Sequence, residues 1–558
     1  MSTDVTYKDR PWIKHYAPGV PANLQYKEIC IPQMLKDTVQ IYPDKTALVC
    51  QDFHVAYKEL DVMVDRFAAV LSGFGIKKGD KVAVLLPNCI QIVVAYYAIL
   101  SLGAVAVMNN PLYSDRELEH QFNDSGSKLL IVLDVLCERM IALREKTGIK
   151  QIIYTSMSDY LPEGVSGTEP LDFSGRENLY RWLDCFRGDA GAGPVVDLSF
   201  DDTAILQYTG GTTGVSKAAV LTHRNLSSMI QMYEAWFVDG KRGDETVLAA
   251  SPFFHILGMQ VSMNLSIYMG WKDVLLPVPQ PFYILEAIRK YNPNFSPLVP
   301  THYIGMLQHP DLEKTDLTSF RGLFSGGASL PVDILHKFEE VSKAEICEGF
   351  GMSETSPQTH LNPYCGGGPR KPGSIGVPWI DTEVRVVDLT DGETDMPVGE
   401  PGEMLFRGPQ VTKGYWNRPD ETEMAITKDG WLHSGDIAYM DSDGYFFVVD
   451  RKKDMIISSG YNIYPREVEE IFYQNPKVSK VAVIGLPDDK RGENVGVFLT
   501  LKEGQAITSD ELMEFCKPKL AKYKWPSLIE IRDSLPESNV GKLLKKELRA
   551  EVLGNMKK

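Results

Sequence analysis

The sequence lacks the paired cysteine spacings that mark disulfide frameworks and zinc sites. Its eight cysteines are scattered over 558 residues, and no C-x-x-C occurs among them. Small secreted disulfide scaffolds and zinc ribbons are therefore excluded, because both need cysteines at short fixed spacings. The opening stretch, MSTDVTYKDRPWIKHY, also holds no apolar core of signal-peptide length. We expect reduced thiols and a cytoplasmic protein.

The sequence also lacks an excess of basic residues. The formal net charge is −16 at pH 7, from 58 Lys and Arg against 74 Asp and Glu. Nucleic-acid binding depends on clustered basic side chains that neutralise phosphates, so we predict no nucleic-acid partner. Small metabolites are the ligands that this composition favours.

One apolar run tests for a membrane span. Residues 92–108, IVVAYYAILSLGAVAVM, carry no charge over 17 positions, the lower limit for a spanning helix. Pro87 and Gly103 instead bracket a buried helix, and AVAVM then predicts a buried strand. We therefore predict no transmembrane segment. The basic C-terminal stretch GKLLKKELRAEVLGNMKK leaves peripheral membrane contact open, although a solvated helix is the simpler interpretation.

The sequence does contain a regular alternation of short β-rich runs with helical stretches. This alternation occupies residues 47–180 and returns at 200–350, as in a parallel sheet covered by helices. Short strands and turns then predict a small β-rich subdomain at about 373–449. From residue 454 onward, helices at PREVEEIFYQ and DELMEFCKPKL flank strands at KVAVIGLP and GVFLTL, which predicts a compact α+β unit.

We therefore predict an α/β fold in two domains. A large N-terminal domain of two doubly wound sheets, with the β-rich subdomain, spans 1–449, and a mobile α+β domain spans 454–558. The charged junction DRKKD predicts a hinge at 450–453, although a charge run is more often just a solvated face.

A glycine- and threonine-rich loop, YTGGTTGVSK at 208–217, resembles a P-loop at first sight. A P-loop needs four residues between its first Gly and Gly-Lys, but Gly210 and Gly214 enclose only three, and Lys217 follows three residues later. The loop is therefore not a Walker motif. Its glycines still let backbone N–H groups converge on an oxyanion, and its threonines add donors. By itself such a loop fits a flexible turn equally well.

Six further motifs follow this loop in chain order. They are SPFFHILG (251–258), SGGASL (325–330), GFGMSETSP (349–357), GWLHSGDIAY (430–439), VVDRKKDMIISSGYNIYPREVEE (448–470) and SNVGKLLKKELR (538–549). Taken together, these motifs resemble the acyl-adenylate-forming superfamily and, within it, the medium- and long-chain fatty acyl-CoA ligases. The resemblance runs from about residue 30 to about 550.

The resemblance implies a two-step reaction with ATP, Mg²⁺ and coenzyme A. A carboxylic acid attacks the α-phosphate of ATP and releases pyrophosphate, and the coenzyme A thiol then displaces AMP from the acyl-adenylate. No covalent protein intermediate is needed, so catalysis should rest on positioning and charge stabilisation. In this family the C-terminal domain swings about a hinge between the two steps.

The resemblance also assigns nucleotide-binding residues. The β- and γ-phosphates would be held by Thr209, Gly210, Gly211, Thr212, Thr213, Gly214 and Lys217. Adenine and the acyl carbon would approach Gly326, Gly327, Ala328, Phe350, Gly351 and Met352. Asp436 would accept from the ribose hydroxyls and Arg451 would contact ribose or phosphate. Lys453 would be the hinge residue, and the coenzyme A channel would be lined by Ser459, Gly460 and Tyr461.

Four residues are implied in catalysis. Ser353 would donate to the α-phosphate, Glu354 would hold Mg²⁺, and Lys542 would bridge the carboxylate and the α-phosphate. His255 would gate the acid site, although a buried core histidine is an equally ordinary interpretation. Amino-acid-activating relatives place an Asp near this motif, and Phe254 and His255 stand here instead, so an amine substrate would lack its counter-ion.

Three departures and several alternatives remain. Ser353 stands where the family more often has Thr, Ala218 replaces a glycine, and Gly210 replaces a common Ser, a variant associated with the fatty-acid branch.

The leading hypothesis is a fatty acyl-CoA ligase. The alternatives are an aryl or alicyclic acid-CoA ligase, a fatty acyl-AMP ligase that delivers to a carrier protein, a non-catalytic nucleotide-binding regulator and a luciferase-like oxygenase. Oligomeric state is left open, with a homodimer among the options. Candidate apolar walls for the acid are Met263, Leu265, Ile267, Thr301, Tyr303 and Met306.

Overall fold

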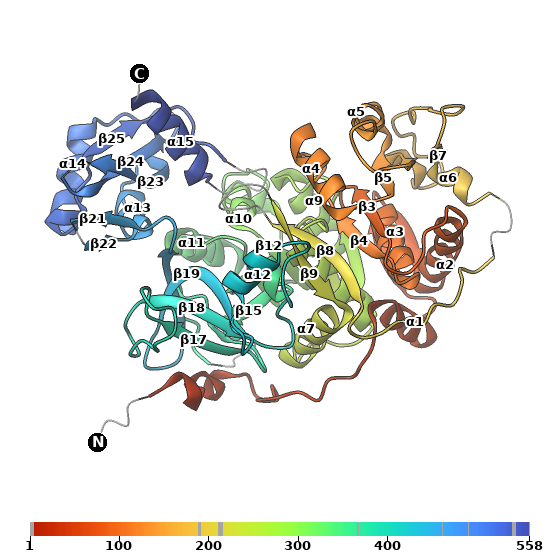
Figure 1. The fold of residues 1–558 in the computed structure, drawn as a ribbon, viewed down its shortest axis with the longest axis horizontal. Helices are drawn as coiled ribbons and strands as arrows, with labels where there is room; N and C mark the ends of the chain where they lie inside the picture. The colour runs from red at the N-terminus through yellow and green to blue at the C-terminus, as the bar shows by residue number, and fades with distance from the viewer. Residues whose placement is uncertain are drawn as a thin grey trace. The chain divides into compact units, whose positions relative to one another are not determined.

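The computed structural model describes residues 5–187, 191–209, 216–364, 368–459, 461–488, 490–537 and 543–556. The chain divides into two compact units. The larger unit spans Trp12–Glu383 and Phe406–Leu432, and the smaller comprises Met1–Pro11, Val384–Leu405 and His433–Lys558. Both combine helices with sheets (Figure 1), which confirms the predicted mixed α/β fold.

The first sheet of the larger unit has seven strands in the order β7-β6-β5-β3-β4-β8-β9. All neighbouring pairs are parallel except the last, β8 with β9. Its central strands β3, β4 and β5 are buried on both faces and therefore read as continuous apolar runs. In chain order they are β3 (Lys81–Leu85), β4 (Val105–Met108), β5 (Leu129–Leu133), β6 (Gln151–Thr155), β7 (Leu179–Arg181), β8 (Thr203–Thr209) and β9 (Lys217–Thr222).

The second sheet of this unit has nine strands in the order β16-β15-β14-β13-β12-β10-β11-β1-β2. Its six central strands, from β14 to β1, are parallel, and antiparallel strands close both edges. In chain order they are β1 (Thr46–Cys50), β2 (Phe53–Ala56), β10 (Thr246–Ala249), β11 (Lys272–Leu275), β12 (Phe295–Leu298), β13 (Gly322–Ser325), β14 (Ile346–Gly351), β15 (Gln358–Leu361) and β16 (Val377–Pro378).

Helices alternate with these strands along the chain, as the sequence predicts. They are α1 (Ile31–Ile41), α2 (Tyr57–Gly73), α3 (Ile90–Ser101), α4 (Asp115–Ser125), α5 (Asp134–Arg144), α6 (Trp182–Cys185), α7 (His223–Trp236), α8 (Leu265–Met269), α9 (Pro281–Tyr291), α10 (Pro300–Leu307), α11 (Val332–Ser342) and α12 (Pro419–Ala425).

Helix α3 explains the uncharged run at 92–108. Every residue from Ile90 to Leu100 is buried, and the helix contacts β3 and β4 of one sheet and β1 of the other. It therefore lies between the two sheets, which leaves no face for polar side chains. The predicted buried helix followed by a buried strand is confirmed by α3 and β4. Across the described residues, no helix is long and apolar enough to cross a membrane.

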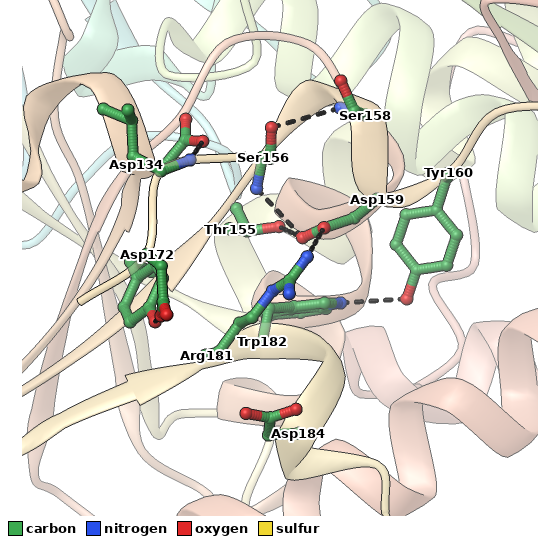
Figure 2. A network of polar contacts seen from close by, with 12 residues as sticks. Asp134, Thr155, Ser156, Ser158, Asp159, Tyr160, Asp172, Arg181, Trp182 and Asp184 are labelled. Carbon is green, nitrogen blue, oxygen red and sulfur yellow. Dashed lines mark hydrogen bonds and ion pairs between the residues drawn. The ribbon is translucent and has the colours of Figure 1, made fainter. Parts of the chain in front are cut away.

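Figure 2 shows the polar network beside strands β6 and β7, at the edge of the seven-stranded sheet. Asp159 accepts hydrogen bonds from the Thr155 hydroxyl at 2.8 Å and the Ser156 backbone N–H at 2.9 Å, and it pairs with Arg181 at 3.3 Å. Trp182 Nε1 donates to the Tyr160 hydroxyl at 2.9 Å. The Asp159 side chain is only 1% exposed. Through these hydrogen bonds and this ion pair, the Asp159 carboxylate stabilises the turn after β6.

The smaller unit contains two sheets. A four-stranded sheet has the order β17-β18-β19-β20, and a second sheet has the order β22-β21-β24-β23 with β25 beside β24. Helix α13 packs on β23, as expected for the predicted α+β unit. The elements are β17 (Glu383–Val387), β18 (Gly402–Arg407), β19 (Leu432–Met440), β20 (Phe446–Arg451), β21 (Ile456–Ser458), β22 (Tyr461–Ile463), α13 (Pro465–Tyr473), β23 (Val478–Asp488), β24 (Gly492–Leu501), α14 (Ser509–Cys516), β25 (Leu528–Ile531) and α15 (Lys545–Met556).

Candidate functional site

The glycine- and threonine-rich loop at 208–217 connects the antiparallel strands β8 and β9. The pairing of Thr209 with Lys217 closes the hairpin, and the Thr209 hydroxyl donates to the Lys217 carbonyl at 3.3 Å. Helix α7 follows at once, with Thr222 as its N-cap accepting from the Asn225 N–H. The chain therefore runs here from strand to loop to strand to helix. The loop residues Gly210, Gly211, Thr212, Thr213 and Gly214 lie outside the described residues.

Lys217 emerges from this hairpin with two partners. Its Nζ lies 3.0 Å from a carboxylate oxygen of Glu421 and 3.7 Å from the centre of the Tyr415 ring. Its side chain is 24% exposed, so the ammonium group remains accessible from solvent. An anion that approaches Lys217 would therefore compete with Glu421 for it.

Glu354 lies in a short 3₁₀ turn, Ser353–Thr355, and is 5% exposed. The Tyr415 hydroxyl donates to its Oε1 at 2.8 Å, and the backbone N–H of Thr412 donates to its carbonyl at 2.7 Å. Ser353, next to it, is partly exposed. Tyr415 therefore contacts both Glu354 and Lys217 and brings two predicted site residues from distant motifs together.

The donor set suits Mg²⁺ held jointly with a nucleotide. Mg²⁺ in phosphate-transfer sites typically takes one or two carboxylates and completes its shell with phosphate oxygens and water. Glu354 offers one buried carboxylate with Oε1 already oriented by Tyr415. No group of three or more His, Cys, Asp or Glu is placed to hold a metal anywhere in the described ranges. Glu354 therefore fits a shared site and not a preformed protein cage.

The SGGASL motif directly follows β13. The Gly326 N–H donates to the Leu298 carbonyl at 3.2 Å, and Gly327 has φ +78°, a conformation that favours glycine. Gly326 is partly exposed, and Gly327 and Ala328 are exposed, which leaves this backbone open to a ligand.

The aromatic ring predicted to stack on adenine comes from β14. Phe350 is partly exposed, as are Gly351 and Met352 after it, and its ring packs against Phe406 at a centroid distance of 6.0 Å. A Cβ on Gly351 would lie 2.0 Å from the Pro357 carbonyl oxygen. Glycine is therefore required at 351 for the turn that presents Ser353 and Glu354.

His255 lies in a tight turn between β10 and a π-helix at Gly258–Asn264. Burial lowers the pKa of His255 to about 4, so its imidazole is neutral at pH 7. Strand β10 ends at Ala249, before the SPFFHILG motif begins. The reason is Asn88, whose amide donates to the Ala249 and Ser251 carbonyls and accepts from the Phe253 N–H at 2.7 Å.

The π-helix links three of the motifs. Gln260 donates to the carbonyl of Leu226 in α7 at 3.1 Å and to that of Ser356 at 3.2 Å. A Cβ at Gly326 would lie 3.7 Å from the Leu257 side chain. The SPFFHILG, SGGASL and GFGMSETSP motifs are therefore neighbours in the larger unit. The sequence pattern did not predict the π-helix, a form often found at functional sites.

The candidate wall residues for the acid are mostly core. Tyr303 and Met306 belong to one apolar cluster with α9 and α11, and Thr301 is exposed. Met263 in the π-helix and Leu265 and Ile267 in α8 are also fully buried. Their role as walls stays a prediction.

The predicted ribose ligands lie in the smaller unit. Asp436 in β19 pairs with Arg451 in β20, and Arg451 Nε lies 3.2 Å from the Asp436 carboxylate. Asp436 is 3% exposed, whereas the Arg451 side chain is 38% exposed. The two residues face one another, and their role as nucleotide ligands stays a prediction. Lys453 is exposed just beyond β20.

The predicted coenzyme A residues lie at the hairpin between β21 and β22. Ser459 has φ +51° and is exposed, and its N–H donates to the Arg491 carbonyl at 2.7 Å. Tyr461 is 57% exposed and stacks on Tyr523 at 4.8 Å. Gly460 and the predicted adenylation lysine, Lys542, lie outside the described residues.

Sequence reasoning missed Tyr415 and Glu421. Both occur in the stretch GYWNRPDET, where Pro419 begins α12 and the preceding residues form an isolated β-bridge at Tyr415 followed by a turn. An aromatic residue beside a Gly in a turn-rich stretch was the available signal, but it did not reveal a contact with Glu354.

Two family models and several known proteins match this chain over most of its length. The family model described as AMP-binding enzyme matches residues 35–416, and the model of the AMP-binding enzyme C-terminal domain matches 467–542. A long-chain-fatty-acid CoA ligase of Bacillus subtilis is 41% identical over 557 residues, covering 98% of this chain and 99% of its own. One from Escherichia coli is 36% identical over 563 residues, with 98% and 99% covered.

Solved structures share the fold. ATP-bound MatB from Rhodopseudomonas palustris is 28% identical with a TM-score of 0.82, covering 94% of this chain and 99% of MatB. The anthranilate CoA ligase AuaEII in complex with anthranoyl-AMP is 26% identical with a TM-score of 0.84, covering 96% of this chain and 98% of its own.

Proposed function

This chain belongs to the AMP-binding enzyme family, and from that premise we propose that it is an AMP-forming acid-CoA ligase whose acid is a medium- or long-chain fatty acid. The observation that carries the proposal is the 41% identity to a long-chain-fatty-acid CoA ligase across 98% of the chain. A cytoplasmic location is part of the proposal, and the free cysteines of the described residues are compatible with it.

In the first step, a carboxylate oxygen of the fatty acid bonds to the α-phosphorus of ATP. The bond from that phosphorus to the bridging oxygen breaks, and pyrophosphate leaves with the electron pair. Lys217 and the loop before it would bind the β- and γ-phosphates, and the Ser353 hydroxyl would donate to the α-phosphate. Bound Mg²⁺, held by Glu354, would neutralise charge on the phosphate oxygens. These groups would lower the barrier by stabilising the charge that develops on the phosphate oxygens.

In the second step, the coenzyme A sulfur bonds to the acyl carbon, its proton is lost, and AMP leaves as the carbon–oxygen bond breaks. Ser459 and Tyr461, both exposed on the β21–β22 hairpin, would line the path of the thiol arm. Lys542 would act in the first step only. A hinge at 450–453 would separate the two steps, because Lys542 would serve the first step and the β21–β22 hairpin would serve the second.

Further residues are assigned to the nucleotide. Phe350 offers a partly exposed ring for adenine, and Gly326, Gly327 and Ala328 offer an open backbone beside it. Asp436 and Arg451 would bind the ribose hydroxyls. The acid would meet a neutral His255, because burial lowers the pKa of that imidazole to about 4. A neutral gate suits an apolar chain better than a charged one does.

The test is coenzyme A-dependent AMP formation with ATP and Mg²⁺ across a series of acids. We would compare acetate, octanoate, palmitate, benzoate and cyclohexane carboxylate, and we expect an optimum among the straight chains from octanoate to palmitate. Activity confined to the two cyclic acids would refute the fatty-acid assignment and favour an aryl or alicyclic acid-CoA ligase. Acyl-AMP formation that coenzyme A does not accelerate would instead favour transfer to a carrier protein.

A further inference from the structure

We propose that Tyr415 is a positioning residue that orients the Glu354 carboxylate and the Lys217 ammonium group for joint binding of Mg²⁺ and ATP. The inference rests on the proposed function, because it concerns the ATP-binding half of that site. Tyr415 would not touch the reacting atoms; it would act through the two residues that it contacts.

The backbone around Tyr415 is fastened to strand β9. The Val220 N–H donates to the Gly414 carbonyl at 3.0 Å, and the Trp416 N–H donates to the Ala218 carbonyl at 2.9 Å. The Thr412 hydroxyl also donates to the Val220 carbonyl at 2.6 Å. Tyr415 therefore pairs with Ala219 in an isolated antiparallel bridge beside the strand that begins with Lys217, and its position is fixed relative to that lysine.

The neighbouring side chains close the other side of Tyr415. The Tyr415 backbone N–H donates to the Thr422 hydroxyl at 2.9 Å, and this bond fixes the orientation of the Tyr415 peptide group. Gly414 has φ +148°, and a Cβ there would lie 2.5 Å from the Thr422 side chain. Glycine at 414 thus lets α12 approach closely, which also brings Glu421 to within 3.0 Å of Lys217.

The Tyr415 hydroxyl holds one oxygen of a buried carboxylate. Glu354 is 5% exposed, and its Oε1 lies 2.8 Å from the Tyr415 oxygen. In this bond the Tyr415 hydroxyl is the donor and the Glu354 carboxylate is the acceptor. With Oε1 held in this way, Oε2 has a defined direction in which to meet a cation.

The Tyr415 ring acts on Lys217. The ammonium nitrogen lies 3.7 Å from the ring centre, within the range in which an aromatic face attracts a cation. Glu421 holds the same nitrogen by an ion pair. One tyrosine therefore connects, through opposite ends of its side chain, an acidic group suited to the metal and a basic group suited to the phosphates.

The larger unit also contains a matched control. Tyr268 donates to Glu234 at the same 2.8 Å, and the Arg242 guanidinium lies 4.4 Å from the Tyr268 ring and 2.7 Å from Glu234. This trio has the same composition of tyrosine, glutamate and cation, but it contains no residue assigned to the nucleotide. Tyr268→Phe therefore removes an equivalent hydroxyl without changing the proposed site.

The experiment compares Tyr415→Phe with Tyr268→Phe by equilibrium dialysis of labelled ATP, without acid or coenzyme A, over a series of Mg²⁺ concentrations. Loss of a group that orients a metal ligand typically weakens metal affinity by about 10- to 100-fold. We expect the Mg²⁺ midpoint for ATP binding to rise by that factor in Tyr415→Phe and to stay at the wild-type value in Tyr268→Phe. An unchanged midpoint in Tyr415→Phe, or an equal rise in both variants, would overturn the proposal.

A second variant covers the case in which Tyr415→Phe does not fold. Glu421→Gln alters a side chain that is 35% exposed and frees Lys217 from the carboxylate that competes with phosphate. Partly exposed ion pairs of this kind correspond to about a 2- to 5-fold change in an equilibrium constant, so we expect ATP to bind that much more tightly. Unchanged ATP affinity would contradict the assignment of Lys217 to this cluster.

Failure of the function and failure of this inference give different results. If the wild type forms no acyl-CoA but Tyr415→Phe still shifts the Mg²⁺ midpoint, the ligase assignment is wrong and the positioning role stands. If the wild type forms acyl-CoA and the midpoint does not move, only the positioning role is wrong.

Discussion

Replacing Gly258 with alanine tests whether the tight turn that contains His255 depends on a residue without a side chain. Gly258 begins the π-helix just after His255. An added Cβ would lie 2.4 Å from the carbonyl oxygens of both Ser251 and Pro252, about 1 Å short of the 3.4 Å at which ordinary contact begins. Both obstacles are backbone atoms, so no side chain can rotate away.

The turn has little freedom to absorb this shift. Asn88 holds its backbone through the Ala249 and Ser251 carbonyls and the Phe253 N–H, and the His255 N–H donates to the Pro252 carbonyl at 3.1 Å. The displacement should therefore pass to Phe254 and His255. A misplacement of about 1 Å can lower a rate about 100-fold, and forcing an extra methyl group into a packed site costs about 1 to 3 kcal/mol of stability.

The assay measures kcat/KM for octanoate and palmitate together with ATP binding by dialysis and thermal unfolding. We expect Gly258→Ala to lower kcat/KM for both acids by about 100-fold, with ATP affinity unchanged. Gly73→Ala is the control, because its added Cβ would meet nothing within 4 Å. Wild-type kcat/KM and an unchanged unfolding temperature in Gly258→Ala would refute the reasoning.

Three further predictions concern the nucleotide, the adenylation lysine and pH. Lys542→Ala should slow adenylation by about 10² to 10³, or about 3 to 4 kcal/mol, while thioester formation from added acyl-adenylate changes far less; equal loss in both assays would contradict the role of Lys542. Asp436→Asn should weaken ATP binding by about 1.5 to 3 kcal/mol, measured by dialysis, and an unchanged dissociation constant would exclude Asp436 as a ribose ligand. Burial lowers the pKa of His223 to about 4 and that of His360 to about 3. Since the unfolded chain then binds more protons below pH 6.5, the free energy of unfolding should fall by about 2 kcal/mol per histidine between pH 7.5 and 5; equal urea midpoints at the two pH values would contradict this.

The alternation of strands and helices could be predicted because each element carries its own period and its own turn signals. The alternation predicted after residue 200 is confirmed by β8, β9 and α7. The α+β texture after residue 454 is likewise confirmed by α13, β23, β24 and α14.

The contacts that organise the site could not be predicted in this way. The bond from Tyr415 to Glu354 joins residues 61 positions apart, and nothing in the local sequence of either specifies the partner. The same holds for Asn88, which binds the backbone at the end of β10 from a distant loop. Such tertiary contacts can override local strand propensity.

Helix α3 and strand β1 have a consequence for how the chain is made. Leu48 of β1 pairs with Asp273 of β11, and α3 packs on both sheets at once. At a synthesis rate of ~5–20 residues per second, β1 and the apolar α3 leave the ribosome on the order of ten seconds or more before β11 exists to receive them. Until then, α3 has one apolar side with no sheet to cover it, and β1 has an open edge. The nascent chain is therefore prone to aggregation during that interval, and the two sheets should reach their native packing together, as a late cooperative event.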